Sequence, residues 1–323
     1  MKYPITRLIA AVLFTVACSA AAGQTYPDKP ITLLVPFPPG ASADGVARIL
    51  GRQLSVTLGK PVVVENRPGG GGTSGLITLA HAAPDGYTLG IGATGAIAVN
   101  RHLPDAAPLD PDKQLAPVAK VADIPLVFIA SQKSGMRSLQ DAAILAQRAK
   151  EGLSYGTAGQ FTSQHLAGEL YAKVASISMT AVPYRGSTPA LTDVIAGQIP
   201  LAVVDLTSAS PHIKSGRVTA LAVTGPARAK AAPDIPTVAE KGYAGYAASG
   251  WLGMFAPAGT PPQIVAKVAG ALKDALTDPK VSAEMTMLAT EPAYLAPDAF
   301  GRYISSESRK WGDIISGMGK KRP

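Results

Sequence analysis

An apolar strand, a turn of proline and glycine, and a helix follow one another near the start of the chain. The segment Ile31–Val35 is typical of a buried strand, and Pro36–Gly40 forms a turn after it. Apolar residues then recur at helical spacing, which predicts a helix over Asp44–Leu58. A helix that begins after such a turn has N–H groups without intrahelical partners, and these suit a carboxylate or phosphate. The alternative is an ordinary structural connection.

Short apolar segments alternate with amphipathic ones along the rest of the chain. We expect strands over Ile31–Val35, Pro61–Val64, Thr88–Ile91, Leu126–Ala130, Leu201–Val204 and Ala220–Val223. We expect helices over Asp44–Leu58, Ser138–Lys150, Thr162–Lys173, Pro189–Ala196, Pro262–Leu276 and Pro297–Ile315. This alternation predicts an α/β fold with mostly parallel sheets, because strands that are apolar on both faces need helices on both sides.

The chain is expected to cross twice between two domains. One crossing is predicted around Val118–Ile124 and the other around Tyr243–Trp251. On this interpretation residues 24–121 and 248–323 form the first domain, and residues 122–247 form the second. Two crossings act as a hinge and leave a cleft between the domains, which is a common place for a ligand.

Residues 1–23 have the pattern of a secretory signal. Basic residues precede the apolar segment Leu8–Ala17, and small residues follow, so cleavage is expected near Ala22 or Gly23. The mature protein should then be exported to the periplasm. The single cysteine, Cys18, lies inside this segment, so the mature chain would hold no thiol; a lipid anchor on Cys18 is the alternative.

Composition and motifs argue against several classes of function. The net charge of +8 is scattered, without a basic stripe interleaved with aromatic residues, so we expect no nucleic-acid partner. The glycine run Gly69–Gly72 lacks the lysine of a phosphate-binding loop and is interpreted as a structural turn. The four histidines have no metal-ligand spacing, so we expect neither a metal nor a cofactor.

Two further glycine loops precede helical segments. One is Gly92–Gly95, after the strand Thr88–Ile91, and the other is Gly159–Ser163. In open α/β sheets such loops meet at the carboxyl ends of the strands, where ligands bind. Closure of the domains would bring several hydroxyls around one anion, although each is equally typical of a helix cap. These hydroxyls belong to Ser42, Thr94, Thr162 and Ser163.

Three other side chains are candidates for the site. Arg185 is suited to pair with a carboxylate and Tyr184 to line a pocket; the alternative is a surface arginine beside a packed tyrosine. Asp205 ends the strand Leu201–Val204. It would accept a hydrogen bond either from a ligand amine or hydroxyl or from a backbone turn.

Several motifs, taken together and in this order, resemble the solute-binding receptors of tripartite tricarboxylate transporters, known as the Bug family. They are Tyr26–Ile31, Val35–Gly40 with Asp44, Ala47 and Arg48, Val64–Gly69, Pro84–Thr88, Val182–Gly186, Ser215–Arg217, Leu221–Thr224, Ile235–Glu240 and Ala256–Pro261. The resemblance implies a two-domain fold of the periplasmic-binding-protein type (type II). It also implies a receptor that closes on a small carboxylate and delivers it to membrane permease subunits. We expect it to act as a monomer.

The resemblance and the loops together give a predicted set of ligand-binding residues. The set is Phe37, Pro39, Gly40, Ala41, Ser42, Asp44, Thr94, Gly95, Gly159, Gln160, Phe161, Thr162, Ser163, Tyr184, Arg185 and Asp205. Two members depart from the family pattern, because Ala41 and Phe161 stand where glycine is common. An aromatic side chain at position 161 would either stack on a flat ligand or fill part of the cleft. Aromatic acids therefore join amino acids and aliphatic di- and tricarboxylates as candidates.

Two other functions fit parts of the same pattern. A signalling receptor would bind the same ligand but present it to a sensor protein instead of a permease. An exported hydrolase would use Ser42 as nucleophile at its strand–helix turn. The hydrolase needs a general base, and no histidine is visibly placed to serve Ser42.

Overall fold

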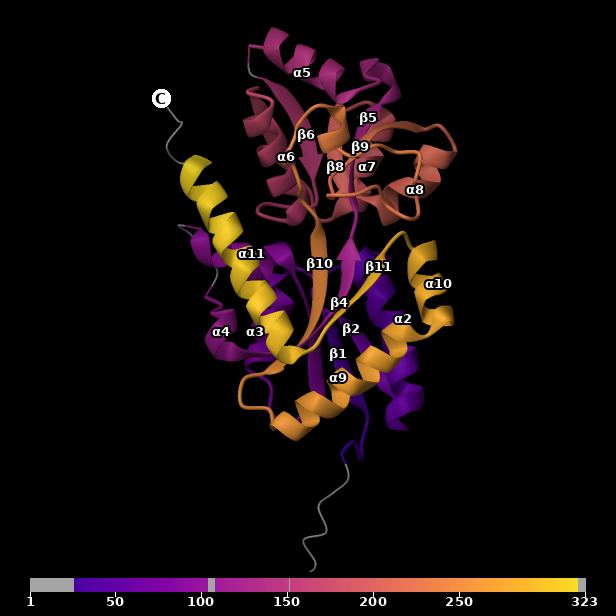
Figure 1. Cartoon of the computed structure of the whole chain (residues 1–323), viewed down its shortest axis with the longest axis vertical. Coiled ribbons are helices and arrows are strands. Elements are labelled where there is room, and N and C mark those ends of the chain that lie inside the picture. Colours follow the sequence, from indigo (N-terminus) through magenta and orange to yellow (C-terminus); the bar gives the residue numbers. More distant parts are fainter. Residues whose placement is uncertain (1–25, 104–107, 151, 319–323) are drawn as a thin grey trace, which may run out of the picture.

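A six-stranded sheet and a five-stranded sheet organise the computed structural model, which describes residues 26–103, 108–150 and 152–318 (Figure 1). The expected signal segment, its cleavage site and Cys18 lie outside the described residues. Within the described ranges, no helix has both the length and the apolar character that crossing a membrane requires.

The first sheet has the strand order β11-β4-β10-β3-β1-β2. Its strands are β1 (Ile31–Val35), β2 (Val62–Asn66), β3 (Thr88–Ala93), β4 (Leu115–Ile124), β10 (Gly250–Pro257) and β11 (Glu291–Leu295). The helices beside it are α2 (Ser42–Leu58), α3 (Thr73–Ala80), α4 (Pro111–Gln114), α9 (Pro262–Thr277), α10 (Pro279–Met287) and α11 (Pro297–Met318). Short turns of helix follow two loops: η2 (Gly70–Gly72), η3 (Gly95–Val99) and η4 (Asn100–His102).

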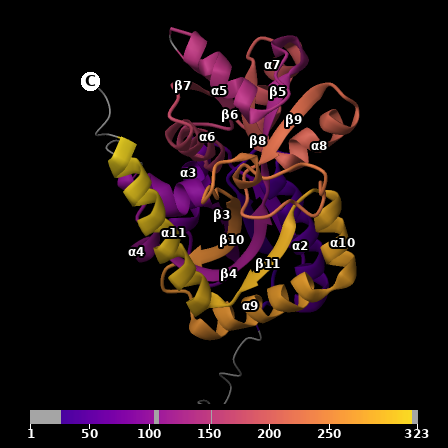
Figure 2. The same cartoon turned by 45° about the horizontal axis from the view of Figure 1, so that its top comes forward.

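The second sheet has the order β7-β6-β8-β5-β9. Its strands are β5 (Leu126–Ser131), β6 (Leu153–Thr157), β7 (Met179–Pro183), β8 (Leu201–Asp205) and β9 (Val218–Val223). Its helices are η5 (Gln132–Ser134), α5 (Leu139–Arg148), α6 (Ser163–Val174), α7 (Ser187–Ala196), α8 (Leu206–Lys214) and η6 (Ala239–Lys241). Figures 1 and 2 show α5, α6, α7 and α8 gathered around this sheet, apart from α9, α10 and α11.

The α/β class is confirmed, but the expectation of mostly parallel sheets is wrong, because both sheets are mixed. β1 runs parallel to β2 and β3, whereas β10 runs antiparallel to β3 and β4. In the second sheet β6 pairs in parallel with β7 and β8, and β5 is antiparallel to β8 and β9. The chain leaves the first sheet along β4 and returns along β10, so these neighbours must run in opposite directions. Short apolar segments carry no signal of strand direction.

The strands are distributed between the sheets in three blocks of sequence. Residues 31–124 and 250–295 supply the first sheet, and residues 126–223 supply the second. This distribution supports the domain division at 24–121 with 248–323 and 122–247, which we propose. The two predicted crossings fall on β4, which is one residue from β5, and at the start of β10.

Local sequence signals explain where several helices begin. Ser138 and Asp141 form a capping box at the start of α5, and the Thr162 hydroxyl caps α6 by accepting a hydrogen bond from the His165 N–H. Four of the described α-helices were not expected from the sequence, namely α3, α4, α8 and α10. α8 directly follows Asp205 and contains Pro211. Because proline disfavours the interior of a helix, the sequence pattern did not predict a helix there.

Aromatic side chains fill the interior of both sheets. The largest fully buried side chains include Phe128, Tyr155 and Trp251. Tyr155 packs so closely on α6 that a Cβ added at Gly168 would lie 2.1 Å from its ring. The Tyr155 hydroxyl also donates to Glu169 at 2.9 Å, which holds the ring in place. Gly168 is therefore required by the packing of this ring.

We predict opposite effects for one substitution made in two helices. Gly168→Ala should lower the free energy of unfolding by about 1–3 kcal/mol, because the Tyr155 ring cannot move away from the new methyl group. Gly270→Ala in α9 should raise it by up to about 1 kcal/mol, because nothing lies within 4 Å and alanine favours a helix. Urea unfolding of both variants measures these values. Equal shifts would contradict the packing that we describe.

Candidate functional site

A cavity lies between the two sheets and is lined by residues of both. The cavity and the open solvent at its mouth together take up about 580 Å³. The lining residues of the first sheet and its loops are Phe37, Pro38, Ala41, Ser42, Gly71, Ala93, Gly95, Ile124, Gly250, Trp251 and Leu252. Those of the second are Leu126, Ala158, Thr162, Ser163, Gln164, Gly186, Ser187 and Asp205.

The N-termini of three long helices meet at this cavity. Helices α2, α6 and α7 begin at Ser42, Ser163 and Ser187, and all three residues line it. Each helix start presents unpaired N–H groups and the positive end of a helix dipole. The described lining contains no lysine, arginine or histidine. Positive potential in the cavity therefore comes from the backbone, an arrangement suited to an anion.

Asp44 holds the first loop in place without lining the cavity. Its carboxylate accepts hydrogen bonds from the Gly40 N–H at 3.0 Å and from the Asn66 amide at 2.9 Å, and it pairs with Arg48. Burial alone would raise the pKa of Asp44, but the hydrogen bonds from Arg48, Gly40 and Asn66 outweigh burial and lower it. Asn66 also donates to the Phe37 carbonyl, so the loop is fixed from two sides. Pro39 and Gly40 belong to this turn and lie outside the cavity lining.

Ala41 fits the turn in spite of its departure from the family pattern. Its φ of −70° and ψ of 159° are ordinary for any residue, whereas Gly40 has a φ of 81°. The Ala41 N–H donates to the Pro38 carbonyl at 3.2 Å, which closes the turn. Ala41 thus lines the cavity without requiring a different backbone.

The glycine run that we interpreted as a structural turn also takes part in the cavity. Its four members all have positive φ angles, from 56° at Gly70 to 145° at Gly69. Gly71 lines the cavity, and a Cβ there would lie 3.3 Å from the Gln160 carbonyl oxygen of the other sheet's loop. The run therefore lets the two parts of the molecule approach each other.

Only the last residues of the segment Gly159–Ser163, which leads into α6, line the cavity. Thr162 and Ser163 line the cavity, whereas Gly159, Gln160 and Phe161 do not. Phe161 has a φ of 58°, and its ring packs 5.5 Å from the His165 ring. The described lining thus gives no support for stacking of Phe161 on a ligand.

His165 ties this loop to α6. Its Nδ1 accepts a hydrogen bond from the Phe161 N–H at 2.9 Å. Burial lowers the pKa of His165 to about 4, so the ring is neutral at pH 7. Protonation of Nδ1 would remove the acceptor and break this hydrogen bond.

Four other predicted residues occupy different positions. Tyr184 lies outside the lining and donates to Asp193 at 2.6 Å, and Arg185 is exposed. Thr94 is buried and does not line the cavity, and its hydroxyl accepts a hydrogen bond from the Trp251 N–H at 2.9 Å. Asp205 does line the cavity and is 6% exposed. Of the predicted set, seven members line it: Phe37, Ala41, Ser42, Gly95, Thr162, Ser163 and Asp205.

Several lining residues were missed by sequence reasoning. Gly186 and Ser187 repeat the pattern of a strand, a glycine turn and a helix, so that signal was present but unused. Gln164 is in the first turn of α6, beside residues that were predicted. Trp251 lies in the second crossing, and its side chain donates to Glu307 of α11 at 3.2 Å. That contact joins residues far apart in the sequence and left no local signal.

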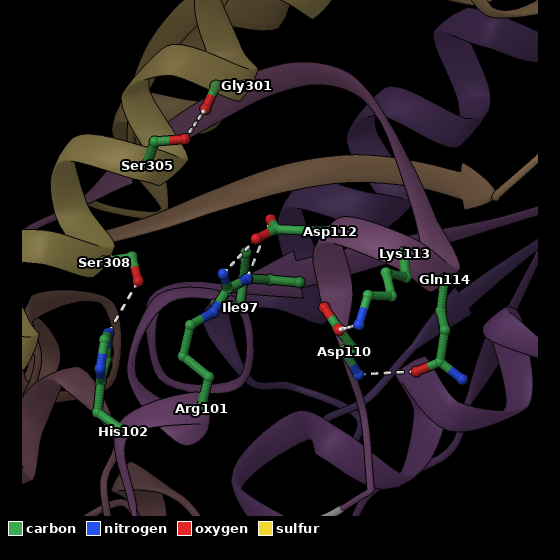
Figure 3. A network of polar contacts seen from close by, with 10 residues as sticks. All are labelled: Ile97, Arg101, His102, Asp110, Asp112, Lys113, Gln114, Gly301, Ser305 and Ser308. Carbon is green, nitrogen blue, oxygen red and sulfur yellow. Dashed lines mark hydrogen bonds and ion pairs between the residues drawn. The ribbon is translucent and has the colours of Figure 1, made fainter.

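A network of polar contacts anchors the segment that carries Gly95 (Figure 3). Arg101 pairs with Asp112 and also donates to the Ile97 carbonyl in the middle of η3. The His102 ring contacts the Ser308 hydroxyl of α11 at 2.8 Å. These contacts fix the segment of η3 and η4 between α4 and α11. Residues outside the cavity therefore hold Gly95 in position at the cavity.

Comparison with known proteins identifies the family. Residues 46–320 match the model of the tripartite tricarboxylate transporter family receptor. The chain belongs to this family. Protein BugT of Bordetella pertussis (strain Tohama I) is 34% identical over 98% of this chain and 99% of its own length. In the described residues, no group of three or more histidine, cysteine, aspartate or glutamate side chains could hold a metal ion.

Solved structures agree with this assignment. A protein of R. palustris solved with adipate is 30% identical, with a TM-score of 0.85 over 91% of this chain and 98% of that chain. MatC from Rhodopseudomonas palustris, solved with bound malate, is 32% identical, with a TM-score of 0.83 over 90% of this chain and 100% of that chain. The fold is therefore that of the periplasmic binding proteins.

We predict that His165 makes the protein sensitive to acid. The pKa of His165 is about 4 in the folded protein against 6.5 for the free side chain, so the unfolded chain binds more protons between these values. The free energy of unfolding should fall as the pH drops from 6.5 towards 4, by up to about 3 kcal/mol. In the His165→Gln variant, this part of the pH dependence of the free energy of unfolding should be absent.

The matched control is His81→Gln, because His81 is exposed. Unfolding by urea at several pH values between 4 and 7 measures the slope for each protein. The slope should be smaller in the His165 variant alone. An unchanged slope in that variant would contradict a buried neutral histidine.

Proposed function

We propose that this protein is a periplasmic receptor that captures a small carboxylate between its two domains and delivers it to the permease subunits of a tripartite transporter. The observation that carries the proposal is the meeting of three helix N-termini at one cavity whose described lining has no cationic side chain. Relatives solved with adipate and with malate support a carboxylate as the ligand.

Backbone recognition of this kind suits a ligand that arrives in water and must leave again. The N–H groups at a helix start are already oriented, so binding an anion requires little reorganisation. Ser42 belongs to the first domain, and Ser163 and Ser187 belong to the second. An anion held by both groups of N–H donors would favour the closed arrangement, which is the state a receptor presents to its partner.

Location and partners complete the proposal. We infer export to the periplasm with cleavage near Ala22 or Gly23, in keeping with the basic and apolar pattern before them. The receptor acts as a monomer, and a signalling receptor that serves a sensor protein is the alternative use of the same site. We further propose binding without turnover, because the Ser42 hydroxyl donates to Asp205 and no histidine lines the described cavity.

The first test is a thermal-shift screen. Mature protein, refolded to remove any bound ligand, is heated with mono-, di- and tricarboxylates, amino acids and aromatic acids. A ligand at about 100 times its Kd should add about 2.7 kcal/mol to the free energy of unfolding, which raises the Tm by a few degrees. Folded protein that responds to no carboxylate would contradict the proposal.

We predict that Gly95→Ala weakens binding by preventing close approach of the two domains. A Cβ at position 95 would lie 2.8 Å from the Phe161 carbonyl oxygen, which is backbone and cannot turn aside. The Kd of the carboxylate that gives the largest thermal shift should rise about tenfold, equivalent to about 1.4 kcal/mol. Titration calorimetry measures it. Gly270→Ala, the same change on an open helix face, should leave the Kd as it is.

A further inference from the structure

Asp205 places an acidic group in a cavity whose other features suit an anion. It ends β8, lines the cavity and is 6% exposed. A carboxylate ligand would therefore meet a carboxyl group at the same place as the helix N-termini. The chemistry of Asp205 decides which carboxylates the cavity accepts.

The contacts of Asp205 leave part of its hydrogen-bonding capacity unused. One carboxyl oxygen accepts from the Ser42 hydroxyl at 2.6 Å, and the other accepts from the Gln164 amide. Its backbone N–H donates to the Ser187 hydroxyl at 3.2 Å. The Ser187 hydroxyl also acts on the carboxyl group. A carboxylate accepts about four hydrogen bonds, so roughly one position remains for a donor in the cavity.

No cation compensates Asp205. Its partners are hydroxyl and amide groups, and among the described residues no lysine, arginine or histidine acts on it. Burial raises the pKa of Asp205, and the hydrogen bonds from Ser42, Gln164 and Ser187 do not fully offset that effect. An uncompensated buried carboxylate is costly, and a ligand that brings a donor would relieve the cost. A ligand that carries only carboxylate groups would place its negative charge beside that of Asp205.

The position of Asp205 fixes where on the ligand that donor must be. Ser42 is the first residue of α2, and its hydroxyl lies 2.6 Å from the Asp205 carboxyl. A carboxylate bound at the α2 N-terminus would thus have Asp205 beside it. A donor on the adjacent carbon of the ligand would reach Asp205, whereas a donor several carbons away would point elsewhere.

We propose that Asp205 accepts a hydrogen bond from a hydroxyl or ammonium group next to the bound carboxylate, so that the receptor selects 2-hydroxy and 2-amino acids over the corresponding plain acids. This inference rests on the proposed function, because it assumes that the cavity binds a carboxylate. Asp205 then serves as the specificity-determining residue of the cavity.

Three acids of one carbon skeleton test the proposal. Succinate has no extra donor, malate carries a 2-hydroxyl group, and aspartate carries a 2-ammonium group. The wild-type protein should bind malate or aspartate at least about tenfold more tightly than succinate, as expected for a hydrogen bond to a charged group. Adipate and 2-aminoadipate repeat the comparison with a longer chain. Equal affinities within both sets would overturn the proposal without any variant.

Asp205→Asn should reduce the preference to about threefold or less while succinate binds as well as before or better. Asparagine keeps the shape and one acceptor but removes the charge. Asp193→Asn is the matched control, because Asp193 also accepts from a hydroxyl at 2.6 Å yet lies outside the cavity lining. The control should keep the wild-type preference. A preference that survives Asp205→Asn in folded protein would overturn the assignment to Asp205.

The outcomes separate this inference from the proposed function. Wild-type protein that is folded but binds no carboxylate would overturn both. Binding of plain and donor-bearing acids with equal affinity would overturn the role of Asp205 and leave the receptor function standing. If Asp205→Asn does not fold, the wild-type affinities for the two sets of acids decide the matter.

Discussion

The close approach of two backbones is the constraint on which the rest of the structure depends. The N-termini of three helices lie at one cavity because the loops of the two sheets approach each other closely at glycine residues. At Gly95 a Cβ would lie 2.8 Å from a carbonyl oxygen of the opposite loop, and at Gly71 it would lie 3.3 Å from another. Glycine at these positions allows N–H donors from both sheets to face the same space.

Sequence reasoning located the loops better than the side chains. The strand, turn and helix around Ser42 and the cap at Thr162 follow from local rules of apolar spacing and capping, so both were predictable. Tyr184 and Arg185 were placed in the site by their chemistry and by the family resemblance of the motif around them, and the structure has both outside the cavity lining. Which way a side chain points depends on packing partners that are remote in sequence.

Two features of the fold had no local signal at all. The direction of β10 follows from the return of the chain after the second sheet, and an apolar strand has the same composition in either direction. The glycine run was recognisable as a turn, but its contact with the loop at Gln160 exists only between elements that lie far apart along the chain. Domain contacts of this kind are set by tertiary structure.

Recognition by backbone groups has a consequence for how specificity can change in such a receptor. N–H donors at helix starts are present whatever side chains surround them, so a lining substitution that still allows the two sheets to approach each other changes the shape of the cavity and leaves these donors in place. A charged side chain is the exception, because its contribution to the binding free energy depends on the other polar or charged groups of the ligand. Asp205 is the one ionisable side chain in the described lining, and it accepts a hydrogen bond from Ser42, which follows a strand of the other sheet. On our proposal, the choice of ligand and the closure of the domains therefore depend on the same carboxyl group.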